Sequence, residues 1–403
     1  MLYTVVNQKF VNGVRRSVLL EKGFPAYYPT LYVSRKMKNN SANRQRNFNN
    51  SIKVFFEWLM YENIDIEKRF IDNQPLTKIE IFRLLDYLIW DAGTRYNLIK
   101  KVRMLTSAYK QIKKETYITR TLDVKNYISF LYLELATAKN KMEIEIEISK
   151  NIESYRPKIK RYSRNSVRAI TDEQLNILFE KIMPENKENP WYDSSVQIRN
   201  LLIVNLLYET GLRKGELAGL YVSDINISEN TISIYRRQNN KLEKRIDAPS
   251  VKTGERTIPI PDDLVSIIDL YILKHRSKIK EAKKHPYLLI SHKRNKGKPM
   301  TLKSIAEVFV RLHKIFPELK GISAHDFRHN MNYRISKMID ENFADKTPED
   351  KSVIDEQVRP HIMGHSPNSK MQQVYNKRYN IEEANKIMKE RVSRYNKDEE
   401  YDS

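Results

Sequence analysis

The segment RNLLIVNLLYETG at residues 199–211 limits the fold more than any other part of the chain. Its apolar residues fall on nearly every side of a helix, so this helix must be surrounded by other elements. Gly211 is expected to end it, because glycine adopts the left-handed conformation that closes many helices. The second half of the chain therefore predicts a domain built around one central helix.

The region before residue 154 carries shorter amphipathic patterns. SIKVFFEWLMYE and TKIEIFRLLDYLIW repeat apolar residues at spacings of three and four, which predicts helices. Two more helices are expected near 95–114 and 124–138. The run MEIEIEI at 142–148 alternates with period two, so we expect a strand there, with a helix end as the alternative.

Short strand patterns and a helix-capping sequence indicate where the domains begin and end. Short β-like runs at Leu2–Val6 and Val14–Leu20 predict a small hairpin, and the sequence TDEQ at Thr171–Gln174 is a capping box that opens a second domain. With 403 residues, two or three domains are expected. The predicted divisions are an N-terminal β-like segment at 1–30, a helical domain at 31–153, a basic linker at 154–170, a second domain at 171–380, and a C-terminal helix and tail at 381–403.

The second domain should also contain a small sheet. TISIYRR, VKTGERTIPIP and YLLIS are typical of strands, and helices are expected from Pro261, from Thr301 and through Ala324–Ile339. The fold class predicted from these patterns is mainly α with a small β-sheet (α+β).

The charge favours a polyanionic partner. The formal net charge is +22 and the isoelectric point is near 9.7, and a field of that sign attracts nucleic acid. The basic residues also cluster in two stretches without acids, between Glu21 and Glu57 and between Glu153 and Asp172. The alternative is a merely soluble, lysine-rich surface. The predicted DNA-binding residues are Arg35, Lys36, Lys38, Arg44, Arg46, Arg156, Lys158, Lys160, Arg161 and Arg164.

Composition excludes several other classes. The chain has no cysteine, which rules out a disulfide framework, cysteine-ligated zinc and a thiol nucleophile. Its first residues, MLYTVVNQKF, are too short an apolar run for a signal peptide, and no stretch approaches the ~20 apolar residues of a membrane span. We expect a soluble cytoplasmic protein, with no metal site.

Four short segments carry candidate functional residues. Arg213 follows Gly211 and precedes Glu216, so it can offer its guanidinium to a phosphate or form a surface pair with that glutamate. Lys252 precedes a Thr-Gly turn between two expected strands, where it reaches outward or only solubilises the turn.

The other two segments contain histidines. His325 and Arg328 are three residues apart in AHDFRHN, share a helical face and can bind one anion, or else form a structural pair. His365 follows Gly364 near an expected helix start, a position that attracts anions or simply caps the helix, and Tyr375 lies ten residues further on.

Taken in order, the series G-L-R-x-G-E, hairpin lysine, H-x-x-R, G-H and tyrosine resembles the tyrosine recombinase family, the phage-integrase type of site-specific DNA recombinase. The resemblance covers about residues 171–380 and is nearest to integrases of phages and conjugative transposons. It implies a helical core-binding domain followed by a catalytic domain. The catalytic residues it implies are Arg213, Lys252, His325, Arg328, His365 and Tyr375, with Glu216 supporting the first arginine.

The resemblance also implies a mechanism. Two arginines would neutralise the scissile phosphate and stabilise its transition state. Tyrosine titrates near ~10, so a histidine would help take its proton as it attacks, while Lys252 would protonate the departing 5′ oxygen. The 3′-phosphotyrosine product keeps the bond energy, so neither ATP nor a metal cofactor is expected. The implied partners are double-stranded DNA at recombination sites, a homo-tetramer on synapsed DNA and a possible accessory DNA-bending or directionality factor.

Two features depart from the family pattern. Arg328 and His365 are 37 positions apart, which is long, and the acidic insert at about 341–357 is expected to be exposed. Tyr379 lies four residues after Tyr375 and is the alternative nucleophile. Other functions stay open at this point: a catalytically silent DNA-binding protein of the same fold, a type IB topoisomerase-like enzyme, or an unrelated RNA-binding protein.

Overall fold

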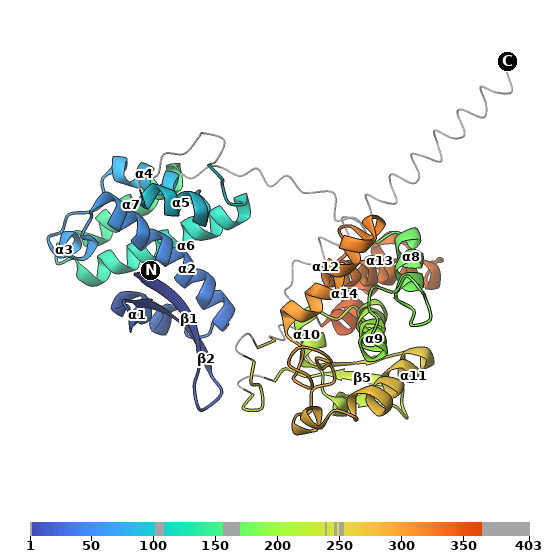
Figure 1. The fold of residues 1–403 in the computed structure, drawn as a ribbon. Coiled ribbons are helices and arrows are strands. Elements are labelled where there is room, and N and C mark those ends of the chain that lie inside the picture. The colour runs from blue at the N-terminus through green and yellow to red at the C-terminus, as the bar shows by residue number, and fades with distance from the viewer. Residues whose placement is uncertain are drawn as a thin grey trace, which may run out of the picture. The chain divides into compact units, whose positions relative to one another are not determined.

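The computed structural model of the protein describes residues 2–100, 109–155, 170–237, 240–245, 248–249 and 254–364. The chain folds into two compact units, Met1–Tyr162 and Ser163–Ser403, each with its own hydrophobic core (Figure 1). Among the described residues, no helix is both long and apolar enough to cross a membrane.

The first unit opens with the expected hairpin. Strands β1 (Tyr3–Lys9) and β2 (Arg15–Glu21) pair antiparallel, and a short β3 (Phe24–Pro25) extends the sheet from β2. One face of β2 packs on a helix, where Leu19 is buried. The hairpin therefore belongs to the core of the first unit.

Seven helices complete the described part of this unit. Their core combines aliphatic and aromatic side chains, and Trp58 and Tyr127 are both fully buried in it. The helices are α1 (Tyr27–Lys36), α2 (Ala42–Glu62), α3 (Ile66–Ile71), α4 (Lys78–Leu88), α5 (Ala92–Ile99), α6 (Lys114–Leu135) and α7 (Lys141–Tyr155).

Two expectations for this unit are wrong. The period-two run at 142–148 forms the start of helix α7, and its packing residues are Ile144, Ile148 and Ile152, spaced by four, while Ile146 is exposed. The helix expected near 95–114 is wrong in its described second half, because α5 ends at Ile99 and Gln111 forms a β-bridge with Trp90; residues 101–108 lie outside the described residues.

The second unit is built around α9 (Ser194–Thr210), which lies in its middle (Figure 1). Leu202, Val204 and Leu207 of α9 are fully buried, as the apolar pattern predicted. The surrounding helices are α8 (Asp172–Ile182), α10 (Lys214–Gly219), α11 (Asp262–Leu270), α12 (Leu302–Ile315), α13 (Ala324–Asn342) and α14 (Pro348–Met363).

A three-stranded antiparallel sheet in the order β4-β5-β6 covers one side of this unit. It consists of β4 (Ile225–Asn226), β5 (Thr231–Ile234) and β6 (Arg256–Pro259). The strand expected at YLLIS is wrong: this buried, extended segment forms isolated bridges, Tyr221 with Tyr287 and Ile290 with Pro299. The hydrogen bonds of its first part go to residues 220–222 and those of its second part to residues 298–300, so no continuous ladder forms.

The acidic insert at 341–357 is largely exposed, as expected, but its second half is helical. Thr347 caps helix α14, with Pro348 in the first turn, and α14 packs against α13. The buried Arg359 of α14 forms an ion pair with Asp355 and donates to the backbone oxygen of Asn332 at 2.7 Å. The second half of the insert therefore begins helix α14, which ends at Met363 with Gly364 as its C-cap, directly before His365.

Candidate active site

The junction between α9 and α10 positions Arg213. Gly211 ends α9 at φ +59°, and a Cβ atom there would lie 2.8 Å from Cγ of Met331 on α13, so both conformation and space require glycine. Arg213 is the N-cap of α10, and its backbone N–H donates to Oε2 of Glu216 at 3.1 Å. The Nη1 atom of Arg213 lies 3.5 Å from Oε1 of Glu216, which is completely buried. Both hypotheses for Arg213, an ion pair with Glu216 and binding of a phosphate, apply in part. Arg213 contacts Glu216, and yet its side chain is 32% exposed.

Arg256 at the start of β6 is a site residue that the sequence reasoning missed. Its side chain is 4% exposed, and its Nη2 atom lies 2.9 Å from Oε2 of Glu216. Its Nε donates to the backbone oxygen of Ile362 at 2.9 Å. Arg256 therefore connects the Arg213 segment with the end of α14.

Helix α13 presents the H-x-x-R motif. Ser323 and Asp326 form a capping box that fixes the start of the helix one residue before His325. Arg328 is buried, and its guanidinium donates to the backbone oxygens of Gly211 at 3.0 Å and Met363 at 2.7 Å.

His325, by contrast, is exposed, and its ring contacts that of His329 with centroids 4.3 Å apart. The pKa of His325 is lowered, first by partial desolvation of the ring and then by the positive charges of Arg328 and Arg213, against the opposing effect of Asp326.

Three of the predicted catalytic residues, Lys252, His365 and Tyr375, lie outside the described residues. The nearest described backbone groups are nevertheless paired, because the N–H of Gly254 donates to the carbonyl of Gly364 at 3.2 Å. Gly254 is two residues after Lys252, and Gly364 is one residue before His365. The segment before β6 and the end of α14, which are far apart in the sequence, therefore meet in the described structure, and Arg328 joins the end of α14 to the Arg213 segment.

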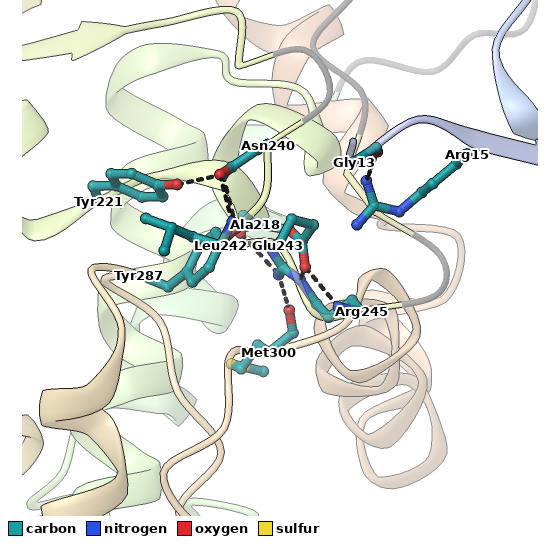
Figure 2. Close-up of polar contacts among 10 residues, drawn as sticks. All are labelled: Gly13, Arg15, Ala218, Tyr221, Asn240, Leu242, Glu243, Arg245, Tyr287 and Met300. Carbon is teal, nitrogen blue, oxygen red and sulfur yellow. Dashed lines mark hydrogen bonds and ion pairs between the residues drawn. The ribbon is translucent and has the colours of Figure 1, made fainter. Parts of the chain in front are cut away.

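The connection between β5 and β6 contains Lys252. Contacts of Arg245, which precedes that lysine in the connection, hold this segment in place. Arg245 donates to the backbone oxygens of Ala218 at 3.0 Å and of Met300, and forms an ion pair with Glu243 (Figure 2). Its guanidinium also lies 4.4 Å from the centre of the Tyr287 ring. These contacts fix the segment against the end of α10.

The predicted DNA-binding residues fall into different environments. Arg35 pairs with Glu134 at 2.9 Å, and Arg44 pairs with the buried Asp123. Lys36 and Lys38 are exposed, while Arg46 is half-buried. The remaining five, Arg156, Lys158, Lys160, Arg161 and Arg164, lie outside the described residues.

No group of three His, Cys, Asp or Glu side chains is placed to hold a metal ion within the part of the chain that the structure describes. The site instead contains the guanidinium groups of Arg213, Arg256 and Arg328, and guanidinium groups bind anions.

Comparisons with known proteins identify a similar family and similar proteins. The sequence model of the Phage integrase family matches residues 168–346. Transposase A from transposon Tn554 of Staphylococcus aureus is 27% identical over 305 residues, which are 74% of this chain and 77% of the transposase. Tyrosine recombinase XerD of Halalkalibacterium halodurans is 26% identical over 133 residues, 33% of this chain and 39% of that protein.

A solved structure shares the fold. The Tn1549 transposon integrase, in complex with transposon right end DNA, superposes with a TM-score of 0.50 at 16% identity, and the match covers 86% of this chain and 92% of the integrase. The fold and the site thus define a tyrosine-type recombinase. Residues 168–346 match the phage integrase family, and the similarity to transposase A, over 74% of this chain, extends into both units of the structure.

Proposed function

We propose that this protein is a site-specific DNA recombinase that cleaves and rejoins DNA strands through a 3′-phosphotyrosine linkage, and that it integrates or excises a mobile element. One observation carries the proposal: the buried guanidinium of Arg328 binds the backbone of both Gly211 and Met363. It thereby joins the segments that lead to Arg213 and to His365, which supports a common location for the motif residues.

Arg213 and Arg328 would hold the scissile phosphate and stabilise its pentacoordinate transition state, in which negative charge increases. The hydroxyl of Tyr375 would attack phosphorus, and its proton would pass to a neighbouring base, for which His325 and His365 are the candidates. The bond from phosphorus to the 5′ oxygen then breaks, and that oxygen receives a proton from Lys252. The reverse steps, with a new 5′-hydroxyl as the nucleophile, rejoin the strands.

This mechanism requires neither metal nor ATP, because the arginines supply the positive charge that a metal would otherwise provide. The proposed substrate is double-stranded DNA at recombination sites, bound by a homo-tetramer. An accessory DNA-bending or directionality factor is a possible further partner. The similarity to a transposase and to a transposon integrase supports a mobile element as the source of the DNA sites.

The nucleophile is tested by Tyr375→Phe. The variant should lose all covalent attachment to DNA and keep its binding affinity, since only a hydroxyl group is removed. The substrate is a nicked suicide duplex that carries the site selected by the wild-type protein from a random DNA pool, and denaturing gels detect the complex with and without EDTA.

Tyr379→Phe is the matched control, because it removes the same hydroxyl from the other candidate. It should form the covalent complex at the wild-type level. A complex that persists in Tyr375→Phe and disappears in Tyr379→Phe would exchange the two roles, and a wild-type complex that EDTA abolishes would contradict the metal-independent mechanism.

A further inference from the structure

Glu216 is shared between two arginines. Its Oε2 atom accepts from the backbone N–H of Arg213 at 3.1 Å and lies 2.9 Å from Nη2 of Arg256. Its Oε1 atom lies 3.5 Å from Nη1 of Arg213, at the limit of hydrogen bonding. The side chain of Glu216 is completely buried, that of Arg256 is nearly so, and that of Arg213 is one-third exposed.

These distances decide which arginine balances the glutamate. A buried carboxylate is costly unless a cation pairs with it, and attraction between charges is strongest where water is excluded. Arg256 is both closer to Glu216 than the guanidinium of Arg213 and more deeply buried. The negative charge of Glu216 is therefore balanced mainly by Arg256.

The consequence concerns Arg213. If Glu216 were paired with Arg213 alone, the carboxylate would offset the positive charge that is to bind a phosphate, and the pair would be only structural. With Arg256 as its counter-ion, Glu216 still accepts the backbone N–H of Arg213 and fixes the start of α10. The guanidinium of Arg213, partly exposed, then keeps its charge for an anion.

We infer that Arg256 is a positioning residue: it acts as the counter-ion of Glu216 and so leaves Arg213 available to the scissile phosphate. This inference rests on the proposed role of Arg213. It assigns Arg256 no contact with DNA.

Arg256→Met removes the charge and keeps most of the volume. Glu216 should then draw the Arg213 guanidinium toward itself, and covalent-complex formation should slow by at least about tenfold, up to the ~10²–10³ expected for loss of one transition-state donor. In the double variant Glu216→Gln with Arg256→Met, no carboxylate competes for Arg213, while the glutamine oxygen can still accept its backbone N–H. Cleavage should recover by about tenfold relative to the single variant, which is within the coupling typical of residues in one network.

A merely structural role gives the opposite result. Arg256 also binds the Ile362 oxygen, and if that contact were what matters, the double variant would be as slow as Arg256→Met or slower. Equal rates in the two variants would therefore overturn the inference. Arg334 of α13 and Glu209 of α9 lie 3.5 Å apart and provide the matched control pair. The single variant Arg334→Met and the double variant Arg334→Met with Glu209→Gln should both cleave at about the wild-type rate.

Two further variants keep the test decisive. Arg256→Lys retains the charge and should stay active even if Arg256→Met melts below the assay temperature; a lysine variant as slow as the methionine variant would also refute the inference. Arg213→Ala reports on the proposed function separately. If it cleaves normally, the assignment of Arg213 fails, whereas a slow Arg213→Ala beside a normal Arg256→Met would refute the role of Arg256 alone.

Discussion

His325 occupies a position where neighbouring charges act in opposite directions. Partial desolvation, and after it the charges of Arg328 and Arg213, lower its pKa from the ordinary value of 6.5, while Asp326 raises it. The imidazole of the free protein is therefore mostly neutral at pH 7, and a neutral imidazole can accept the proton that an attacking hydroxyl loses.

This electrostatic description predicts two shifts of opposite sign. Removing a positive neighbour with Arg213→Met should raise the pKa of His325, and removing the negative one with Asp326→Asn should lower it further. NMR titration of the imidazole protons measures both shifts, with His325→Asn to assign the signal. If both substitutions moved the pKa in one direction, a change in burial would be responsible and the charges would not.

The effect of this histidine on stability follows from the same sign. Folding lowers its pKa, so the unfolded chain binds the proton more tightly. The cost to folding is absent well above pH 6.5, appears as the pH falls through that value, and stops growing below the lowered pKa.

The residues of the site differ in how far the sequence could predict them. Arg213, His325 and Arg328 belong to short patterns that are specific only as an ordered series, and that series was readable. Arg256 was missed because its partners, Glu216 and Ile362, are far away in the sequence. A signal was present nevertheless: on a strand Arg256 shares a face with the buried Ile258, so an arginine was directed at the core.

At the scale of elements, predictions failed where a pattern fitted two periods. Ile144, Ile146 and Ile148 alternate, but Ile144, Ile148 and Ile152 also form a stripe with a spacing of four. In the structure the residues spaced by four pack against the core, and Ile146 is exposed. The glutamates at the intervening positions also favour a helix over a strand. Local periodicity could not decide this, because the partner surface comes from other helices.

Helix α14 provides a prediction at this scale. Arg359 is fully buried and donates to Asp355, to Asn332 and to the hydroxyl of Ser336 at 2.6 Å. Arg359→Met would leave Asp355 buried without its counter-ion, and breaking a buried pair in this way costs about 3–5 kcal/mol. We expect α14 to detach from α13, seen as faster amide hydrogen exchange in α14 than in α9.

A surface pair between α14 and α13 is the control. Lys351 lies 3.4 Å from Asp340, and both side chains are partly exposed, so the loss in Lys351→Met should not exceed about 1 kcal/mol. Equal exchange in both variants would show that the Arg359 network does not hold the helix. Since α14 ends directly before His365, detachment should also slow cleavage more than it weakens DNA binding.

At the scale of the whole molecule, the sequence predicted the division into parts better than their content. The capping box at Thr171 and the basic linker predicted a boundary between two bodies, and each unit has its own large hydrophobic core, with a smaller cluster between α13 and α14. The ion pairs that use the basic residues were not predictable. Arg44, expected to bind DNA, contacts the buried Asp123, which comes from α6 far along the chain.

The basic linker remains a prediction, because residues 156–169 lie outside the described part of the chain. Binding to DNA releases counterions, and the logarithm of the affinity falls with the logarithm of salt by ~0.9 for each phosphate neutralised. If the linker contacts phosphates, neutral replacements of Arg156, Lys158, Lys160 and Arg161 should weaken binding to all sequences alike. They should also flatten the salt dependence by about one unit for each lost contact.

A matched variant separates direct contact from the general field of the protein. Neutral replacements at Lys274, Lys278, Lys280 and Lys283, exposed lysines of the second unit, remove the same formal charge elsewhere. If only the total charge of the protein matters, both variants should lose affinity equally, because both remove the same net charge. If the linker follows the DNA backbone, only the linker variant changes the salt slope. An unchanged slope and affinity in that variant would leave the linker as a soluble connection, without affecting the assignment of the catalytic residues.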